Sequence, residues 1–386
     1  MRVCLVSSSF YPAIFYGGPI FSTWDLSKKL GSRNLDVYVS TTNANGNQRL
    51  KDVSTEKHIK QAENVFVRYY HEQIINVFSF SFLFGIFSDI KKSDVVYIQY
   101  LFHYTVFFSL LFSVLLRKKI ILCPRGSFSF FTLSNKRIWL KKMWLFLFVS
   151  LIKKKIIWQA SSDLEKQDIL SYFPKANVTI ISDGIDVDSF SNSNKINKKD
   201  LLKKYTNKDF NKVSDIIFSM GRLHQIKRFD ILIEAFKLYL NQNENAKLLI
   251  AGADDGVKKN LKNQIKELNL EDKVFLIGLI NFHQKKEIFN NCSFFSLASE
   301  FESFGIVVAE ALSCGVPVVV SDKTSWKNIE RNNCGIFASN QKENFCDAFH
   351  EIKNKNFKPD DCKKYVRDNF DWKVVTDKFL ILLTKD

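Results

Sequence analysis

Short apolar runs alternate with helical patterns along both halves of this 386-residue chain, and this alternation most limits the possible folds. The first half contains "RVCLVSS", "DVYVSTT", "DVVYIQY", "KIILCPRG" and "IIWQASS", and the second half contains "DIIFSMGRL", "AKLLIAGA", "KVFLIG" and "SFFSLAS". Repeated strand, loop and helix predict parallel, doubly wound α/β sheets. Because the chain exceeds one typical core, we expect two such Rossmann-like domains.

A polar stretch rich in Ser, Asn and Lys separates the two halves. We therefore predict an N-terminal domain over residues 1–187, a linker over 188–213 and a C-terminal domain over 214–371. The amphipathic end of the chain, 372–386, predicts a helix that closes the first domain. Ligands of open parallel sheets bind beyond the carboxyl ends of the strands, so we expect the two domains to face a central cleft.

The charge of the chain is strongly positive, at +16. Residues 1–190 carry 24 Lys and Arg against 14 Asp and Glu, so the excess is concentrated in the first half. Such a bias indicates an anionic partner, namely nucleic acid, a phosphorylated substrate or an acidic membrane surface.

The cysteines indicate a reducing compartment. All seven are scattered and no CxxC pair occurs, so neither a disulfide framework nor a zinc site is predicted. The first ten residues hold too short an apolar run for a signal peptide. We expect a cytoplasmic protein.

Two apolar stretches need separate treatment, because each partly resembles a membrane span. The stretch 95–116 is interrupted by polar residues and predicts a buried strand followed by a helix. The stretch 143–152 has half the length needed to cross a bilayer. It is flanked by lysines between Lys136 and Lys155. The default prediction is a buried helix, and the alternative is an in-plane helix that touches acidic lipid at the inner face of the cell membrane.

The segment "EFESFGIVVAEALSCGVPVVVSD" places two carboxylates, Glu302 and Glu310, within an apolar context. It predicts a loop, a short helix that ends near Gly315, and a buried strand. Backbone N–H groups at the start of that helix would suit an anion or a sugar hydroxyl, and Gly305 lets a ligand approach closely. The alternative is that both acids are ordinary solvated residues.

Two further loops follow predicted strands and precede predicted helices. Arg222 and Lys227 in "GRLHQIKRFDILIEAF" are two cations that suit a diphosphate, or else two solvated loop cations. Gly17 and Gly18 in "SFYPAIFYGGP" would allow a phosphate to approach the backbone. Neither a dinucleotide fingerprint nor a P-loop is present.

One short motif has the Asp-x-Asp spacing of a known type of metal site. It is "DVD", which contains Asp186 and Asp188. Because it follows a strand exit, turn chemistry is the preferred explanation, and no metal site is predicted.

Together these residues carry a resemblance to a known family. The chain resembles the retaining GT-B glycosyltransferases of family 4, on the strength of "ESFGIVVAEALSCGVPVVVS", "GRLHQIKRFDILIEAF", "YGGP" and "ISDGID". "CPRGSF" and "SWKNIERNNCGIF" are similar to a polysaccharide-building subgroup. The resemblance covers nearly the whole chain, and its C-terminal motifs are the more specific.

The resemblance implies a role for each residue of the donor site. Arg222 and Lys227 would stabilise the departing diphosphate, and Glu310 would hold the nucleotide ribose. Glu302 would hold the sugar hydroxyls. The remaining donor-side positions are backbone groups: Phe304, Gly305 and Ile306 at the helix start, and Gly17 and Gly18 in the N-terminal loop.

Two N-terminal residues are candidates for the acceptor side. Arg125 occupies a loop where many family members have a histidine, and its role stays open between an acceptor anion contact, a structural ion pair and a donor contact. His103, just past a strand end, is either a site residue or an ordinary loop or core histidine.

The implied function is a hexosyltransferase that moves a sugar, with retention, from a nucleotide-diphosphate donor to a hydroxyl of a growing, lipid-linked glycan of the bacterial surface. Neither a cofactor nor a metal is expected, and nucleic acid is not an expected partner. Two alternatives stand beside it: a nucleotide-sugar epimerase on a similar scaffold, and a basic nucleic-acid-binding protein, although aromatic and basic residues are not interleaved as such binding requires.

Overall fold

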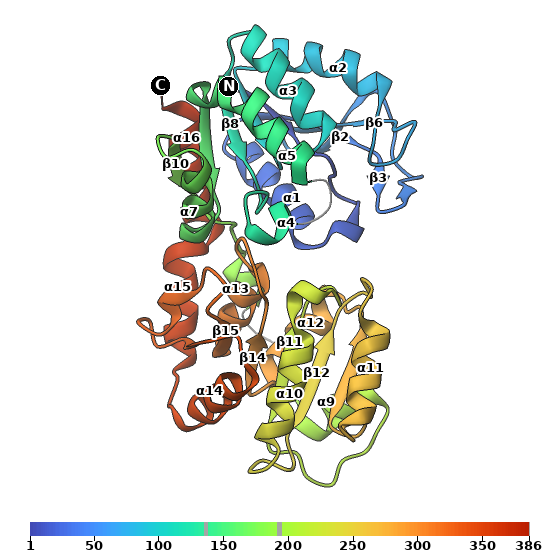
Figure 1. Cartoon of the computed structure of the whole chain (residues 1–386), viewed down its shortest axis with the longest axis vertical. Helices are drawn as coiled ribbons and strands as arrows, with labels where there is room; N and C mark the ends of the chain where they lie inside the picture. The colour runs from blue at the N-terminus through green and yellow to red at the C-terminus, as the bar shows by residue number, and fades with distance from the viewer. Residues whose placement is uncertain (135–137, 191–194, 386) are drawn as a thin grey trace. The chain divides into compact units, whose positions relative to one another are not determined.

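The computed structural model describes residues 1–134, 138–190 and 195–385 (Figure 1). The chain forms two compact units, which are described separately. Unit 1 comprises Met1–Gly184 together with Trp372–Asp386, and unit 2 comprises Ile185–Asp371. Each unit is a mainly parallel sheet with helices on both faces. The predicted class of two Rossmann-like α/β domains is therefore confirmed.

The sheet of unit 1 has the strand order β10-β9-β8-β7-β1-β2-β6-β5, in which β5 is antiparallel to β6 and the other pairs are parallel. Its strands are short and mostly buried, as β-branched apolar runs between two helical layers should be. The strands are β1 Arg2–Val6, β2 Asp36–Thr42, β5 His58–Ala62, β6 Val65–Tyr70, β7 Val95–Gln99, β8 Lys119–Cys123, β9 Ile156–Ala160 and β10 Asn177–Ile180. A separate hairpin joins β3 Ala44–Asn45 and β4 Gln48–Arg49.

Two helical layers cover this sheet. One layer packs α1 and the C-terminal helix α16 onto the same core cluster, so the end of the chain completes unit 1. The other layer holds α2, α3, the consecutive stretches α5, η2 and α6, and then α7. The bounds are α1 Gly18–Gly31, α2 Phe80–Lys91, α3 Tyr104–Leu115, α4 Phe130–Ser134, α5 Ile138–Trp144, η2 Leu145–Val149, α6 Ser150–Ile152, η3 Lys153–Lys155, α7 Asp163–Tyr172 and α16 Trp372–Thr384.

The sheet of unit 2 is parallel with the order β13-β12-β11-β14-β15-β16. Helices α10, α11 and α14 pack on one face, and α9, α12, α13 and α15 on the other. The strands are β11 Ile216–Met220, β12 Lys247–Ala251, β13 Val274–Gly278, β14 Phe294–Leu297, β15 Val318–Ser321 and β16 Gly335–Ala338. The helices are α8 Val187–Phe190, α9 Lys198–Thr206, α10 Phe229–Tyr239, α11 Lys258–Glu267, α12 Phe282–Asn291, α13 Ile306–Ser313, α14 Lys342–Asn354 and α15 Pro359–Phe370.

Both sheets contain a point at which the chain reverses its direction of growth. In unit 1 the chain runs from β1 to β2 and β6, and then returns to β7 on the other side of β1. In unit 2 it runs from β11 to β12 and β13, and then returns to β14 on the other side of β11. Loops after the strands on either side of such a point diverge, which leaves the usual ligand crevice of an open α/β sheet. The four loops after β1, β7, β11 and β14 are therefore the first places to look for a site.

Three local predictions can be compared with the structure. The stretch 95–116 is a buried strand followed by a helix, as predicted. The default prediction of a buried helix for 143–152 holds on one side only, because Leu145, Val149 and Ile152 are buried. On the other side Phe146 and Leu151 are 77% and 80% exposed. Within the residues described, no helix is both long and apolar enough to cross a membrane. Lys136, at the start of the predicted basic flank, lies outside those residues.

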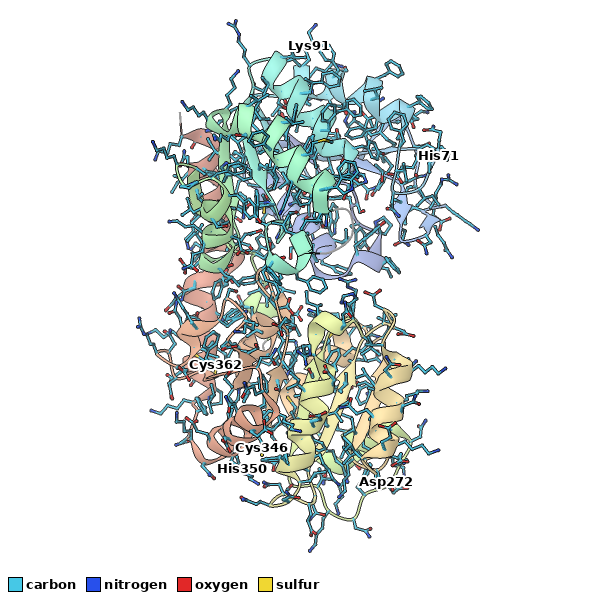
Figure 2. All side chains as sticks on the ribbon, viewed as in Figure 1. His71, Lys91, Asp272, Cys346, His350 and Cys362 are labelled. Carbon is cyan, nitrogen blue, oxygen red and sulfur yellow. The ribbon has the colours of Figure 1, made fainter. Side chains whose placement is uncertain are left out.

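The polar segment between the halves contains one helix of more than two turns among its described residues. Helix α9 buries Leu201 and Leu202 in the core of unit 2, because the pattern "KKDLLKKY" presents one apolar side. All seven cysteines fall within the described residues and are free thiols, among them Cys346 and Cys362, which are labelled in Figure 2.

Candidate functional site

The loop after β11 holds Lys227 against the sheet edge. After Gly221, a single 3₁₀ turn over Gln225–Lys227 leads into α10, and the His224 ring caps that turn by accepting from the backbone N–H of Ile226 at 3.2 Å. Burial lowers the pKa of His224, which favours the neutral ring that capping requires. A side chain on Gly221 would approach Lys227 Cε at 3.1 Å, so the glycine leaves room for the lysine stem.

The loop after β14 supplies the partner of that lysine. Lys227 Nζ forms an ion pair with Glu302 Oε1, and the Ser299 hydroxyl donates to the same oxygen at 2.8 Å. Both charged side chains are mostly buried, with 16% and 12% exposed. Because β11 and β14 flank the reversal point of unit 2, this pair lies at the place where an open sheet binds its ligand.

Backbone contacts fix the two loops against each other. The N–H of Glu300 donates to the carbonyl of Ile226 at 2.8 Å, which ties the loop after β14 to the loop after β11. The end of β12 also approaches closely: a Cβ on Gly252 would lie 1.8 Å from the carbonyl oxygen of Gly221. The ion pair therefore rests on a rigid backbone rather than on two independent loops.

Helix α13 begins beside this pair. Gly305 precedes it with φ of 79°, a left-handed conformation that glycine adopts without strain. The Phe304 side chain is buried against Trp326, and the indole N–H of Trp326 donates to the Phe304 carbonyl at 2.5 Å. The Phe304 side chain is thus part of the core, so Phe304 could contact a ligand only through its backbone. The predicted donor contacts of Phe304, Gly305 and Ile306 remain a prediction.

Glu310 lies on the second turn of α13 and has a partner that sequence reasoning missed. Lys285 Nζ of α12 lies 2.5 Å from Glu310 Oε1, and the two side chains are only 15% and 13% exposed. Lys285 sits in "HQKKEIFNN", where nothing distinguishes it from the other lysines of a Lys-rich chain. The structure therefore contains a second enclosed acid–cation pair, between α12 and α13.

Arg222 forms an ion pair of its own, distinct from the Lys227–Glu302 pair. Its Nη1 lies 2.6 Å from Oδ2 of Asp255, in the loop after β12, and its side chain is 46% exposed. Arg222 is therefore an accessible cation at the same sheet edge, whereas Lys227 is the enclosed one.

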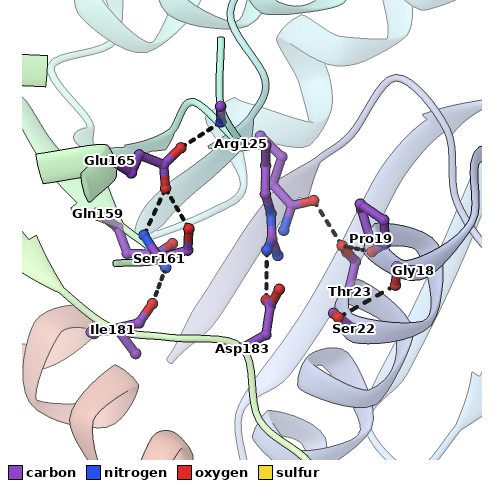
Figure 3. A network of polar contacts seen from close by, with 12 residues as sticks. Gly18, Pro19, Ser22, Thr23, Arg125, Gln159, Ser161, Glu165, Ile181 and Asp183 are labelled. Carbon is purple, nitrogen blue, oxygen red and sulfur yellow. Dashed lines mark hydrogen bonds and ion pairs between the residues drawn. The ribbon is translucent and has the colours of Figure 1, made fainter. Parts of the chain in front are cut away.

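In unit 1, the predicted glycines begin α1 after β1. Gly17 has φ of 75°, and a Cβ placed on it would meet nothing within 4 Å. One turn into the helix, Thr23 Oγ1 lies 2.7 Å from the Pro19 carbonyl and 2.8 Å from Oε1 of Gln99, at the end of β7 (Figure 3). The Gly17–Gly18 turn is thereby fixed to the strand across the reversal point of this sheet.

Arg125 lies in a polar network at the carboxyl end of β8. Its Nη1 forms an ion pair with Oδ1 of Asp183 at 2.5 Å, and the arginine side chain is 4% exposed (Figure 3). The adjacent Gly126 N–H donates to Glu165 at 2.6 Å, and Glu165 also accepts from Ser161. The sequence leaves three roles open for Arg125, and the observed contact with Asp183 corresponds to the structural ion pair.

His103 is the N-cap of α3. Its Nδ1 lies 2.9 Å from the Thr105 hydroxyl and 3.4 Å from the Thr105 backbone nitrogen. Burial lowers the pKa of His103 to about 4, so the ring is neutral at physiological pH. Next to it, the Tyr104 hydroxyl donates to the buried carboxylate of Glu72 at 2.9 Å, and burial raises the pKa of that carboxyl.

The "DVD" motif makes local contacts. Asp186 Oδ1 accepts from the N–H of Ser189 at 3.2 Å, which is turn chemistry, and Asp188 pairs with Arg367 at 2.8 Å. Across the part of the chain that the structure describes, no group of three His, Cys, Asp or Glu is placed to hold a metal ion. Independence from metal remains a prediction.

Comparisons with known proteins agree with this geometry. Residues 203–369 match the model of the family described as Glycosyl transferases group 1, and the match spans the Lys227–Glu302 and Lys285–Glu310 pairs. The chain is 43% identical over 110 residues, 28% of each protein, to N-acetylgalactosamine-N,N'-diacetylbacillosaminyl-diphospho-undecaprenol 4-alpha-N-acetylgalactosaminyltransferase of Campylobacter jejuni.

A second relative covers more of the chain. UDP-Gal:alpha-D-GlcNAc-diphosphoundecaprenol alpha-1,3-galactosyltransferase of Escherichia coli is 28% identical over 229 residues, which are 58% of this chain and 55% of the relative. The chain thus matches between about a quarter and just over half of the length of these curated relatives. These matches do not favour the epimerase or nucleic-acid alternatives.

The fold has a close counterpart among solved structures. HepE of Anabaena, in complex with UDP and glucose, superposes with a TM-score of 0.75 over 100% of both chains, at 16% identity. At that identity the likeness establishes the fold, and the GT-B fold predicted from the sequence is confirmed. The predicted cleft between the domains remains a prediction.

Proposed function

We propose that this protein is a retaining glycosyltransferase that moves a hexose from a nucleotide-diphosphate donor to a hydroxyl of a growing, lipid-linked glycan. The Lys227–Glu302 ion pair carries the proposal, because an enclosed cation and a carboxylate lie at the reversal of strand order in unit 2, where open α/β sheets generally bind their ligands. The family match over residues 203–369 supports the same activity.

The donor would be held by unit 2. The contacts described for Glu302 use Oε1, and we assign Oε2 to a hydroxyl of the donor sugar. The start of α13 would face the diphosphate, since helix N-termini attract anions. Glu310 would accept from the ribose hydroxyls, with Lys285 holding its carboxylate in position until the donor binds.

Stabilisation of the charge on the leaving group would lower the barrier to transfer. As the bond to the sugar breaks, negative charge grows on the leaving diphosphate, and Lys227 and Arg222 would neutralise it. Because both cations are fixed before the reaction, by Glu302 and Asp255, little reorganisation is needed. These cations and the α13 N-terminus would replace a divalent metal, so activity should survive EDTA.

Retention follows if no general base faces the acceptor from the side opposite the leaving group. Glu302 and Glu310 belong to the donor site in this proposal, and Arg125 cannot act as a base at neutral pH. The neutral ring of His103 is the residue that could supply a base. Otherwise the departing phosphate accepts the acceptor proton on the same face.

The acceptor class comes from the relatives. The Campylobacter jejuni and Escherichia coli enzymes both carry diphospho-undecaprenol acceptors in their names. We therefore propose a polyprenyl-diphosphate glycan of a bacterial surface polysaccharide as acceptor.

The test has two stages. A panel of nucleotide sugars is first screened by thermal shift, because a ligand that binds the native state raises the melting temperature. The best donor is then incubated with polyprenyl-diphosphate glycans, and the product linkage is read by NMR. Transfer with the α configuration preserved from an α-linked donor supports the proposal. Release of an altered nucleotide sugar without acceptor, or a β-linked product, would refute it.

A further inference from the structure

Apolar side chains project into solvent along the consecutive stretches α5, η2 and α6. Trp139, Met143, Phe146 and Leu151 are 65%, 45%, 77% and 80% exposed. Their spacing of three to five residues follows one side of a helical path. On the opposite side, Leu145, Val149 and Ile152 are buried in the core of unit 1. This segment therefore has an inward apolar side and a second, outward one.

Helix α2 repeats the pattern in the same layer. Phe80, Phe84 and Phe87 are exposed at 58%, 76% and 40%, and their spacing of four and three residues forms one stripe. Ring contacts connect α2 through α3 to η2. The ring centroids of Phe87 and Phe112 are 5.4 Å apart, and those of Phe107 and Phe148 are 4.9 Å apart. Figure 1 shows α3 beside α2 and α5.

A large part of this region contains no acidic residue. Residues 95–162 include no Asp and no Glu, against eleven Lys and Arg. The default for a folded surface is a mixture of both signs. Arg125 is paired with Asp183 from a later part of the chain, but the stretch of 68 residues supplies no carboxylate of its own to offset its other cations.

The fold gathers the cations along one edge of the sheet. Basic residues lie shortly before the starts of β7, β8 and β9, and these three parallel strands are neighbours. Their amino ends share one edge, where Lys91 is seen at the margin of unit 1 (Figure 2). Asp94 is also at this edge, and its carboxylate accepts from the Arg2 N–H at 2.8 Å. We call the following set the basic rim: Lys91, Lys92, Arg117, Lys118, Lys153, Lys154 and Lys155.

We propose that this layer of unit 1 docks on an anionic lipid surface, with the apolar stripes of α2 and α5–α6 entering the interface and the basic rim contacting the headgroups. Exposed Trp, Phe and Leu beside a row of lysines suit helices that lie in the plane of a bilayer. Aromatic rings favour the headgroup level, and lysines near an anionic surface are attracted to it.

Two other occupants fit the chemistry less well. A second copy of the chain on this layer would bring two basic rims together, and like charges repel. A nucleic acid would engage the lysines, but it would leave Phe84, Phe146 and Leu151 exposed to water. The inference does not depend on the proposed transferase activity. It concerns the edge of unit 1 at the amino ends of the strands, whereas the donor site is proposed in unit 2, and its test uses neither donor nor acceptor.

The test is co-sedimentation of the full chain with vesicles. Vesicles of phosphatidylcholine alone are compared with vesicles that also contain phosphatidylglycerol, at physiological and at high salt. We expect binding to the anionic vesicles only, with loss at high salt as the Debye length falls from about 8 Å to about 3 Å. A triple variant, Trp139→Ser, Phe146→Ser and Leu151→Ser, and a second one, Lys153→Gln, Lys154→Gln and Lys155→Gln, should each weaken binding about tenfold or more.

Matched controls use exposed residues elsewhere. Ile381→Ser on α16 is an apolar control, and the triple change Lys259→Gln, Lys262→Gln and Lys266→Gln on α11 removes the same charge from unit 2. Both should bind like the unchanged protein. Equal binding to neutral vesicles, no binding at all, or unaltered binding by the two test variants would overturn the proposal. A dimer that the Trp139, Phe146 and Leu151 changes dissociate, in the absence of vesicle binding, would overturn it in favour of self-association.

Discussion

Lys227 and Glu302, 75 residues apart in the sequence, form an ion pair between the loops that follow the adjacent strands β11 and β14. Neither loop could hold its charge at that position alone. A buried cation is costly without a partner, and a carboxylate in the same setting is equally so. Each residue therefore makes the position of the other possible, at the reversal point where a ligand is expected.

Replacing Lys227 tests this relationship. Lys227→Ala should lower the rate of sugar transfer by about 10²-fold or more, because one preorganised charge is lost where negative charge develops. It should also destabilise unit 2, since Glu302 is left mostly buried without its cation. Steady-state kinetics and urea unfolding measure the two effects, with Lys266→Ala at an exposed position of α11 as control. Transfer near the unchanged rate would remove Lys227 from the mechanism.

Arg222 should separate catalysis from stability. Its ion pair with Asp255 is half exposed, and such pairs contribute about 1 kcal/mol or less. Arg222→Ala should therefore leave the urea midpoint nearly unchanged while transfer falls by roughly 10²-fold. A large loss of stability, or unaltered transfer, would contradict the assignment.

Glu310 should affect binding rather than chemistry, because a ribose does not change during transfer. Glu310→Ala is expected to weaken nucleotide binding about tenfold or more, with little effect on kcat. Calorimetric titration with the donor identified by thermal shift gives the dissociation constant. Because Lys285 contacts Glu310, the double variant with Lys285→Ala should cost less than the sum of the two single changes. An unchanged dissociation constant in Glu310→Ala would argue against the ribose role.

Gly252 tests the rigidity of the loops. In Gly252→Ala the new methyl group would collide with the Gly221 carbonyl, so the backbone at the end of β11 must move. We expect a loss of about 2–4 kcal/mol in the free energy of unfolding. Gly256→Ala is the matched control, because φ there is 98° but nothing lies within 4 Å, and only about 1–2 kcal/mol should be lost. Equal effects at both positions would show that the close approach is unimportant.

His103 predicts a pH dependence of stability. Its pKa is lowered to about 4 by burial, so the unfolded chain binds more protons than the folded one between pH 6.5 and 4. The free energy of unfolding is therefore not reduced by His103 above pH 6.5, and it decreases as the pH falls from 6.5 toward 4. His103→Asn keeps an N-cap and should flatten that loss by about 2 kcal/mol between pH 7 and pH 5. Parallel pH profiles for the two proteins would show that the ring is not buried as described.

Much of the architecture follows from the sequence. The strand–helix alternation predicts two α/β units, and "FGIVVAEALSCGVPVVVS" predicts a helix, a left-handed glycine and a buried parallel strand. These appear as α13, Gly315 with φ of 75° and β15. Such features depend on residues close in the sequence, namely the spacing of apolar side chains and the special conformations of glycine and proline, so one chain is enough to predict them.

The partners of the charged residues were decided by the tertiary structure. Nothing in the sequence links Lys285 to Glu310, Arg222 to Asp255 or Arg125 to Asp183, because each pair joins loops or helices that meet only through the order of the strands. The same holds for the stretch 143–152, whose apolar pattern suits a buried helix equally well. Whether Phe146 and Leu151 face a core or the solvent depends on which neighbouring helix already covers the sheet, and only the packed layer of α2, α3 and α5–α6 determines that.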